Sequence, residues 1–196
     1  MFGECFDPRL TIRNLALSGR SSKSYRAEGA WDRALSQPAD YVFIQFGHND
    51  QPGKGERSTD PDGDFRENLR AYIADAQAKG IRPILVTPVS RRIWVNGKLE
   101  SSLEPYAAAV RAVGLETKTP VVDLSAVSRR HLEQLGDAAT ADYSPSPTDR
   151  SHFSGKGARA MSRLVAGELP RVVPALGRHV KKNTVDSQVS VRPEQP

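Results

Sequence analysis

The stretch 41–50, YVFIQFGHND, constrains this chain more than any other. It opens with a largely apolar run of strand length that stops at Gly47, and His48, Asn49 and Asp50 follow at once. A buried strand therefore delivers polar groups to a sheet edge, where ligands bind in open α/β sheets. A plain turn is the alternative, because Gly, Asn and Asp all tolerate left-handed backbone.

The rest of the chain alternates between strand and helix patterns. Strands are predicted over 10–17, 41–46, 81–86 and 120–124, and helices over 28–37, 64–79, 103–114, 125–135 and from Ser154 onward. This alternation predicts an α/β fold in which helices cover both faces of a parallel sheet, a three-layer α/β/α sandwich.

The length of 196 residues, with 38% hydrophobic and 26% charged residues, suits one globular domain. We expect that domain to cover 1–174. The residues that follow are polar and lose helical periodicity, so 175–196 are predicted to be a disordered tail.

The net charge of +5 favours a polyanionic partner, either nucleic acid or an acidic polysaccharide. Nucleic acid is disfavoured, because the chain has no blocks of Lys and Arg interleaved with aromatics. No apolar run reaches membrane-spanning length, so no membrane partner is expected. No apolar signal segment follows Met1, and the compartment stays open.

Asp149 and His152 stand three residues apart, just before the last predicted helix. At this spacing the carboxylate can accept from one ring nitrogen and leave the other free as a base. The alternative is an exposed Asp and His in a loop. The other histidines, His48, His131 and His179, are scattered and no paired cysteines accompany them, so neither a metal nor another cofactor is expected.

Three stretches occur in a telling order: SGRSS at 18–22, GHND at 47–50 and DRSHF at 149–153. Together they resemble the SGNH (GDSL-like) hydrolase superfamily, and within it the rhamnogalacturonan acetylesterase-like branch. The resemblance covers roughly residues 10–169. It implies a flavodoxin-like α/β/α fold and a carbohydrate esterase that deacetylates pectic polysaccharide by serine acyl transfer.

The resemblance also implies roles for four residues. The backbone N–H of Gly19 and the side-chain amide of Asn49 would bind the oxyanion of a tetrahedral intermediate. His152 would act as general base and then acid, oriented by Asp149. These groups would converge on one point. Their alternatives are a turn glycine, a turn-forming Asn and a solvated loop pair.

The substrate implied is an acetylated and acidic polysaccharide or oligosaccharide. The residues expected to contact it are Arg20, His48, Arg91 and Trp94, with Lys23, Arg26 and Arg92 as further cations in the same loops. A solvated basic surface explains the charges equally well, a turn explains His48, and packing explains Trp94.

The chain departs from the family in one respect, because it contains neither Gly-Asp-Ser nor G-x-S-x-G. The strand 10–17 matches the family's second strand, so the first strand and its serine are missing. Ser21, Ser22 and Ser151 suit loop or capping roles better than that of a nucleophile. The whole chain is either N-terminally truncated, which we favour because the other site residues are present, or a member that has lost catalysis.

Four functions therefore stay open. The first is the acetylesterase, which would be secreted or periplasmic if a leader precedes Met1. The second is a non-catalytic carbohydrate-binding protein that keeps the cleft, and the third is another SGNH esterase or lipase. The fourth is a basic polyanion binder unrelated to ester chemistry. Whether this chain is itself an enzyme depends on the missing serine.

Overall fold

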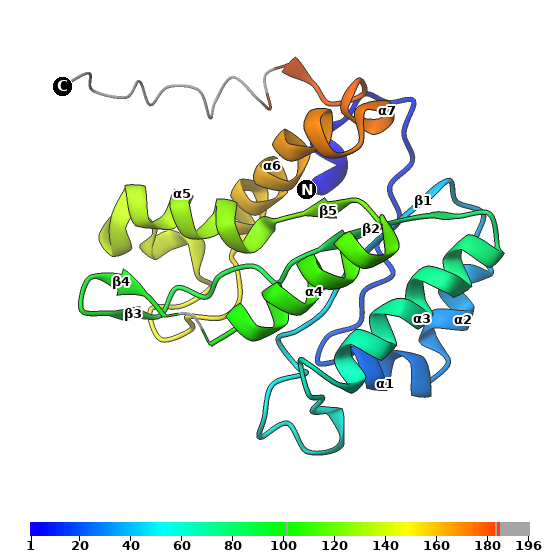
Figure 1. The fold of residues 1–196 in the computed structure, drawn as a ribbon. Helices are drawn as coiled ribbons and strands as arrows, with labels where there is room; N and C mark the ends of the chain where they lie inside the picture. Colours follow the sequence, from blue (N-terminus) through cyan, green and yellow to red (C-terminus); the bar gives the residue numbers. More distant parts are fainter. Residues whose placement is uncertain (101, 183, 185–196) are drawn as a thin grey trace. The chain divides into compact units, whose positions relative to one another are not determined.

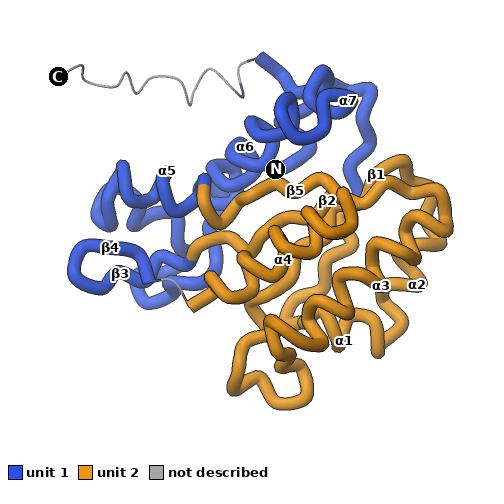
Figure 2. Tube along the Cα trace, in the orientation of Figure 1, with its two compact units in different colours: residues 1–13, 91–100, 127–196 blue, residues 14–90, 101–126 orange. Residues whose placement is uncertain are grey.

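The computed structural model describes residues 1–100, 102–182 and 184. The chain forms two compact units, which Figure 2 colours separately. Unit 1 is built from 1–13, 91–100 and 127–196, and unit 2 from 14–90 and 101–126. The single domain expected over 1–174 stays a prediction.

Unit 2 contains a parallel sheet with the strand order β1, β2, β5. Its strands are β1 (Tyr41–Gln45), β2 (Arg82–Val86) and β5 (Val121–Val122). Tyr41 pairs with Arg82, and Leu85 pairs with Val121. The carboxyl ends of the three strands therefore share one edge. Three of the four predicted strands are formed, and the predicted α/β class with a parallel sheet is confirmed.

The helices of unit 2 supply its core. They are α1 (Ser22–Ala27), α2 (Ala30–Leu35), α3 (Asp64–Ala78) and α4 (Glu104–Thr117), together with the 3-10 turn η2 (Gly55–Arg57). Edge-to-face ring pairs join these elements: Trp31 lies 4.8 Å from Tyr72, and Phe65 lies 5.0 Å from Tyr106. The apolar residues whose spacing predicts helices over 64–79 and 103–114 are thus mostly the buried residues of α3 and α4.

Unit 1 is mostly helical (Figure 1). It holds η1 (Phe2–Cys5), the hairpin of β3 (Trp94–Val95) and β4 (Lys98–Leu99), η3 (Ala141–Tyr143), α6 (Gly155–Val172) and α7 (Pro174–Gly177). It also takes most of α5 (Leu124–Ala139), which is interrupted at Gly136. Helix α6 packs against η1, η3 and α7. Among the described residues, no helix combines the length and apolar content that crossing a membrane requires.

The predicted strand over 10–17 is wrong. These residues belong to no sheet in the described part of the chain, and Ile12, Leu15 and Leu17 are exposed. A strand is held by the backbone of a neighbour, so apolar composition alone does not create one.

The start of the predicted tail also differs from the expectation. Val180 forms an antiparallel bridge with Phe6, and the N–H of Lys181 donates to the carbonyl of Cys5 at 2.9 Å. Pairing with residues at the other end of the chain orders this stretch, and local composition does not reveal such pairing. The rest of the predicted tail, 183 and 185–196, lies outside the described residues.

Candidate active site

The turn after β1 is shaped by Gly47. Its φ is +123°, and a Cβ at this position would lie 3.1 Å from Pro88 Cγ and 3.2 Å from Tyr106 Cβ. Only glycine fits both the backbone and the space. The residues that follow, His48 and Asn49, are therefore delivered at the carboxyl end of the sheet, as the sequence predicts.

Asp50 is the buried residue that holds this turn in place. Its carboxylate is fully buried and accepts from the Ser22 N–H at 2.9 Å, the Ser22 hydroxyl at 2.6 Å, the Gly47 N–H at 2.9 Å and the Thr59 hydroxyl at 3.1 Å. Burial raises the pKa of Asp50, and these four donors oppose the rise. Sequence reasoning placed Asp50 in the turn but missed this role. The sequence contains a signal for this role, because a carboxylate that closely follows a buried strand needs hydrogen-bond donors.

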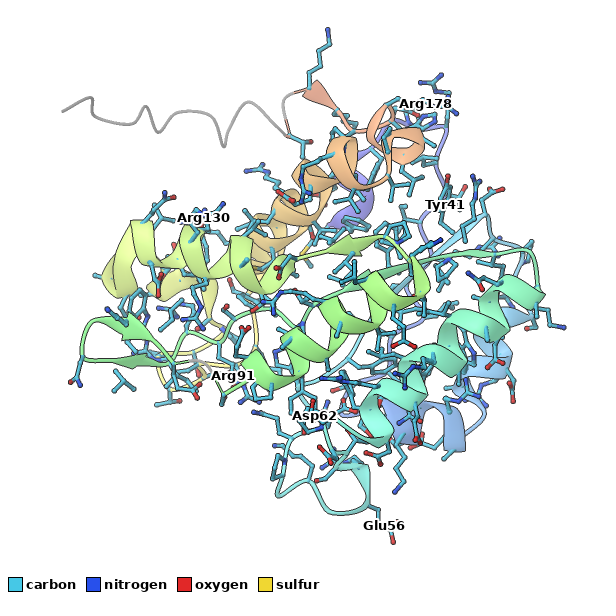
Figure 3. All side chains as sticks on the ribbon, viewed as in Figure 1. Tyr41, Glu56, Asp62, Arg91, Arg130 and Arg178 are labelled. Atoms are coloured by element: carbon cyan, nitrogen blue, oxygen red, sulfur yellow. The ribbon has the colours of Figure 1, made fainter. Side chains whose placement is uncertain are left out.

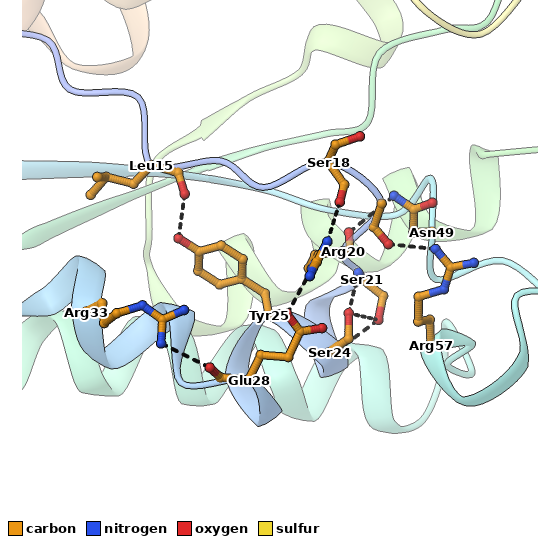
Figure 4. A network of polar contacts seen from close by, with 11 residues as sticks. Leu15, Ser18, Arg20, Ser21, Ser24, Tyr25, Glu28, Arg33, Asn49 and Arg57 are labelled. Atoms are coloured by element: carbon orange, nitrogen blue, oxygen red, sulfur yellow. Dashed lines mark hydrogen bonds and ion pairs between the residues drawn. The ribbon is translucent and has the colours of Figure 1, made fainter.

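The loop that carries Gly19 meets the same turn (Figure 4). Gly19 has a φ of +76°, and its carbonyl accepts from Arg57 Nη1 at 2.7 Å. The Asn49 side chain donates from Nδ2 to the Arg20 carbonyl at 3.3 Å. The N–H of Gly19 donates to no acceptor in the part of the chain that the structure describes. Unit 2 therefore brings the predicted oxyanion residues, Gly19 and Asn49, to one place.

Two predicted substrate residues lie beside them in unit 2. Arg20 donates from Nε to Glu28 Oε2 at 2.9 Å and from Nη1 to the Ser18 carbonyl at 3.0 Å, so part of its guanidinium is already engaged. His48 Nε2 lies 3.1 Å from the Val89 carbonyl, which fixes the proton on that nitrogen.

The serines near Gly19 have structural roles, as expected. Ser21 caps α1 by accepting from the Ser24 N–H at 3.2 Å, and both Ser21 and Ser22 are fully buried. The Ser22 hydroxyl is committed to Asp50. Neither hydroxyl is placed as a nucleophile.

The Asp149–His152 pair forms in unit 1. Nδ1 of His152 lies 2.9 Å from Asp149 Oδ2, and the N–H groups of Ser151 and His152 each donate to Asp149 Oδ1 at 2.9 Å. The His152 and Ser151 backbone donors lower the pKa of Asp149. The His152 side chain is 79% exposed, and Nε2 has no partner among the described residues. The Asp149 carboxylate thus orients the His152 imidazole, and Nε2 of that ring is left to exchange a proton.

The start of α6 fixes the far end of this turn. Ser154 caps the helix, as predicted, by accepting from the Gly157 N–H at 3.2 Å. Its own N–H donates to the Tyr143 carbonyl at 2.7 Å, and its hydroxyl donates to the Asp142 carbonyl at 2.6 Å. The turn is therefore anchored on η3.

The remaining predicted contacts, Arg91 and Trp94, lie in the segment of unit 1 that follows β2, and Figure 3 labels Arg91 there. Both are half-buried, and Trp94 belongs to β3. The neighbouring Arg92 corrects the expectation of a substrate contact. Its side chain is 2% exposed and its guanidinium is consumed by protein acceptors. Sequence reasoning could not see those acceptors, because they lie about 50 residues further along the chain.

No group of three or more His, Cys, Asp or Glu side chains suited to a metal ion occurs among the described residues. The chemistry offered is that of a hydrogen-bonded imidazole in unit 1 and of backbone and amide donors in unit 2.

Comparison with known families shows the family to which the chain belongs. The model of the GDSL-like lipase/acylhydrolase family matches residues 2–160. The chain belongs to this family. The GDSL-like assignment confirms the resemblance of the three motifs to the SGNH superfamily.

Relatives place this GDSL-like chain more finely. It is 34% identical over 170 residues to the probable rhamnogalacturonan acetylesterase YesY of Bacillus subtilis (strain 168), which covers 84% of this chain and 78% of that protein. The crystal structure of YxiM from Bacillus subtilis matches with a TM-score of 0.77 at 30% identity, over 87% of this chain and 49% of that one. Axe2, an acetylxylan esterase from Geobacillus stearothermophilus, matches with a TM-score of 0.67 at 25% identity, over 86% of this chain and 77% of its own. The rhamnogalacturonan acetylesterase-like branch is thereby confirmed.

Proposed function

We propose that this chain carries the oxyanion-binding and base groups of a carbohydrate acetylesterase that acts on acetylated rhamnogalacturonan. The observation that carries the proposal is the Asp149–His152 hydrogen bond of 2.9 Å, in a chain whose relatives include a probable rhamnogalacturonan acetylesterase. The net charge of +5 supports an acidic, pectic substrate over a neutral one.

The proposed reaction needs a serine hydroxyl that none of the residues described above supplies; that hydroxyl attacks the acetyl carbonyl while His152 Nε2 takes its proton. The Gly19 N–H and the Asn49 amide stabilise the oxyanion, a contribution of about 3 kcal/mol for each donor by mutational precedent. His152 then protonates the departing sugar hydroxyl, and water releases acetate from the acyl-serine by the same base. Arg20, His48, Arg91 and Trp94 are proposed to hold the sugar chain.

The absence of a Gly-Asp-Ser motif favours a second function. In that case the chain binds the acetylated polysaccharide without turning it over, since the donors and the base pair are kept but the nucleophile is not supplied by that motif. Binding and acetate release therefore have to be measured side by side.

Acetate release from acetylated rhamnogalacturonan oligosaccharides tests the proposal, with calorimetric binding in parallel. We expect His152→Ala to lower turnover at least about 100-fold, because general acid–base catalysis contributes that much or more. His179→Ala is the matched control. His179 also pairs with an aspartate, Asp7, at 3.0 Å, and its loss should leave turnover unchanged.

Three outcomes are informative. Turnover that depends on His152 supports the acetylesterase. Binding without acetate release supports the second function. A chain that neither binds nor releases acetate overturns both.

A further inference from the structure

Unit 1 contains a buried arginine that the proposed reaction does not use. The guanidinium of Arg92 donates to Thr140 Oγ1 at 3.1 Å, Ser144 Oγ at 2.5 Å and the Ala141 carbonyl at 3.5 Å. It also donates to Asp137 at both its carbonyl, 3.1 Å, and its Oδ1, 2.7 Å. These five acceptors link the end of α5 to η3 through one planar cation.

The same residue holds the turn that carries the imidazole. The N–H of Arg92 donates to the Arg150 carbonyl at 2.8 Å, directly beside Asp149. The Arg150 side chain then donates from Nη1 to Asp137 Oδ1 at 2.5 Å, so one carboxylate receives both arginines. Backbone and side chain both tie this residue of the turn to Arg92.

The other end of the turn reaches Arg92 by a second route. Ser154 is bonded to η3 at Asp142 and Tyr143. Arg92 donates to Ala141, where η3 begins, and to Ser144, the residue directly after η3. The segment from Arg150 to Ser154 is therefore fixed at both ends by groups that converge on one buried side chain. The His152 side chain is 79% exposed, and Asp149 is its only hydrogen-bond partner among the described residues.

Burial of the Arg92 charge makes the clamp formed by Arg92, Asp137 and Arg150 rigid. A buried guanidinium is stable only when its charge is paired and all its donors are met, and breaking such a group costs several kcal/mol. The turn therefore cannot shift without disturbing Arg92. A catalytic base has to stay within a fraction of an ångström of its working position, and a loop without such support does not keep it there.

We propose that Arg92, with Asp137 and Arg150, is a positioning group that fixes the Asp149–His152 pair. Its conformational role stands alone, and only its catalytic consequence rests on the proposed function. The clamp keeps the Ser151 and His152 N–H groups directed at Asp149 Oδ1, and so keeps Oδ2 available to the imidazole.

The pKa of the Asp149 carboxyl, followed by ¹³C NMR, tests this role without any turnover. Those two N–H groups lower this pKa, so loosening the turn should raise it toward the ordinary aspartate value of about 3.9. We expect a rise in Arg92→Met and a smaller rise in Arg150→Met, whose side chain is 39% exposed and whose loss should leave the fold intact. A merely structural role for Arg92 would lower the stability and leave the Asp149 titration of the folded protein unchanged.

Arg129→Met is the matched control. Arg129 also joins α5 to the segment 91–100, through the carbonyls of Leu99 and Glu100, but has no bond to the turn. Its removal should leave the pKa of Asp149 where it is. If Arg92→Met does not fold, Arg150→Met decides.

An Asp149 pKa that stays unchanged in every folded variant, or that rises equally in Arg129→Met, overturns the proposal. Failure of the proposed function is seen elsewhere, as acetate release that is indifferent to His152→Ala. The two results are independent.

Discussion

Asp50 shows how one buried side chain sustains an exposed loop. Its four donors come from the segment after Gly19, from the turn after β1 and from Thr59. The Asp50 carbonyl also accepts from the Tyr106 hydroxyl at 2.8 Å. The residues proposed to bind the oxyanion thus depend on a carboxylate that solvent does not reach.

Asp50→Asn should destabilise the protein by about 3 kcal/mol, because an amide cannot accept from all four donors and buried donors are left unpaired. Urea unfolding at pH 7 measures this loss. The control Asp62→Asn removes the charge of a side chain that is 79% exposed and paired with Arg66, and should cost less than about 0.5 kcal/mol.

The difference in stability between the wild type and Asp50→Asn should depend on pH. Because burial raises the folded-state pKa of Asp50, its stabilising contribution is complete below the unfolded pKa of about 3.9 and is lost as the pH rises through the folded value. The asparagine variant lacks this titration. The advantage of the wild type over Asp50→Asn should therefore be larger at pH 3 than at pH 7. An advantage that shrinks at pH 3 would mean that the four donors outweigh burial.

Individual residues also mark what sequence reasoning can reach. The Asp149–His152 contact was predictable because a hydrogen bond between residues three apart is fixed by local spacing, whereas the catalytic roles of these two residues and of Gly19 and Asn49 come from motif resemblance and stay predictions. Arg92 was misread as a substrate contact because its burial is decided by partners such as Asp137, 45 positions away. No local pattern encodes such a distance.

At the scale of elements, the junction of α6 with η3 holds the turn in place. Gly157 lies in the first turn of α6, where an added Cβ would stand 2.3 Å from the Tyr143 carbonyl oxygen and 2.9 Å from Phe153 Cδ1. The helix approaches η3 this closely because the position has no side chain.

Gly157→Ala should therefore destabilise the protein by about 2 kcal/mol, although alanine favours a helix over glycine by about 1 kcal/mol. Gly155→Ala is the control, since its Cβ would meet only Arg159 Nη1 at 3.7 Å, and it should be neutral or slightly stabilising. Thermal unfolding followed by circular dichroism measures both. Equal effects of the two alanines would contradict close packing at residue 157.

Helices with a strong period were predicted well, and an apolar run predicted a strand correctly only where a second strand pairs with it. The buried faces of α3 and α4 follow the 3.6-residue repeat, and β1 and β2 follow apolar runs. The segment 10–17 has the same apolar character but no strand to pair with among the described residues. Strand formation is a property of two segments, whereas helix periodicity is a property of one.

At the scale of the whole molecule, the net charge of +5 bears on the substrate. On the proposed function, galacturonate carboxylates are attracted by this charge, and salt screens the attraction. Raising NaCl from about 50 to about 300 mM should raise the Kd for acetylated rhamnogalacturonan oligosaccharides roughly threefold or more. The Kd for neutral acetylated xylo-oligosaccharides should hardly change. Calorimetry measures both, and an equal response of the two ligands would contradict an acidic substrate.

The two units are interleaved along the chain, which crosses from one to the other at 13–14, 90–91, 100–101 and 126–127. No single cut in the gene therefore isolates either unit as an uninterrupted polypeptide. A deletion that removes the whole of either unit as one segment also removes part of the other, so loss of activity in such a fragment could not be attributed to one unit. The separate contributions of the two units can therefore be measured by point substitution but not by truncation.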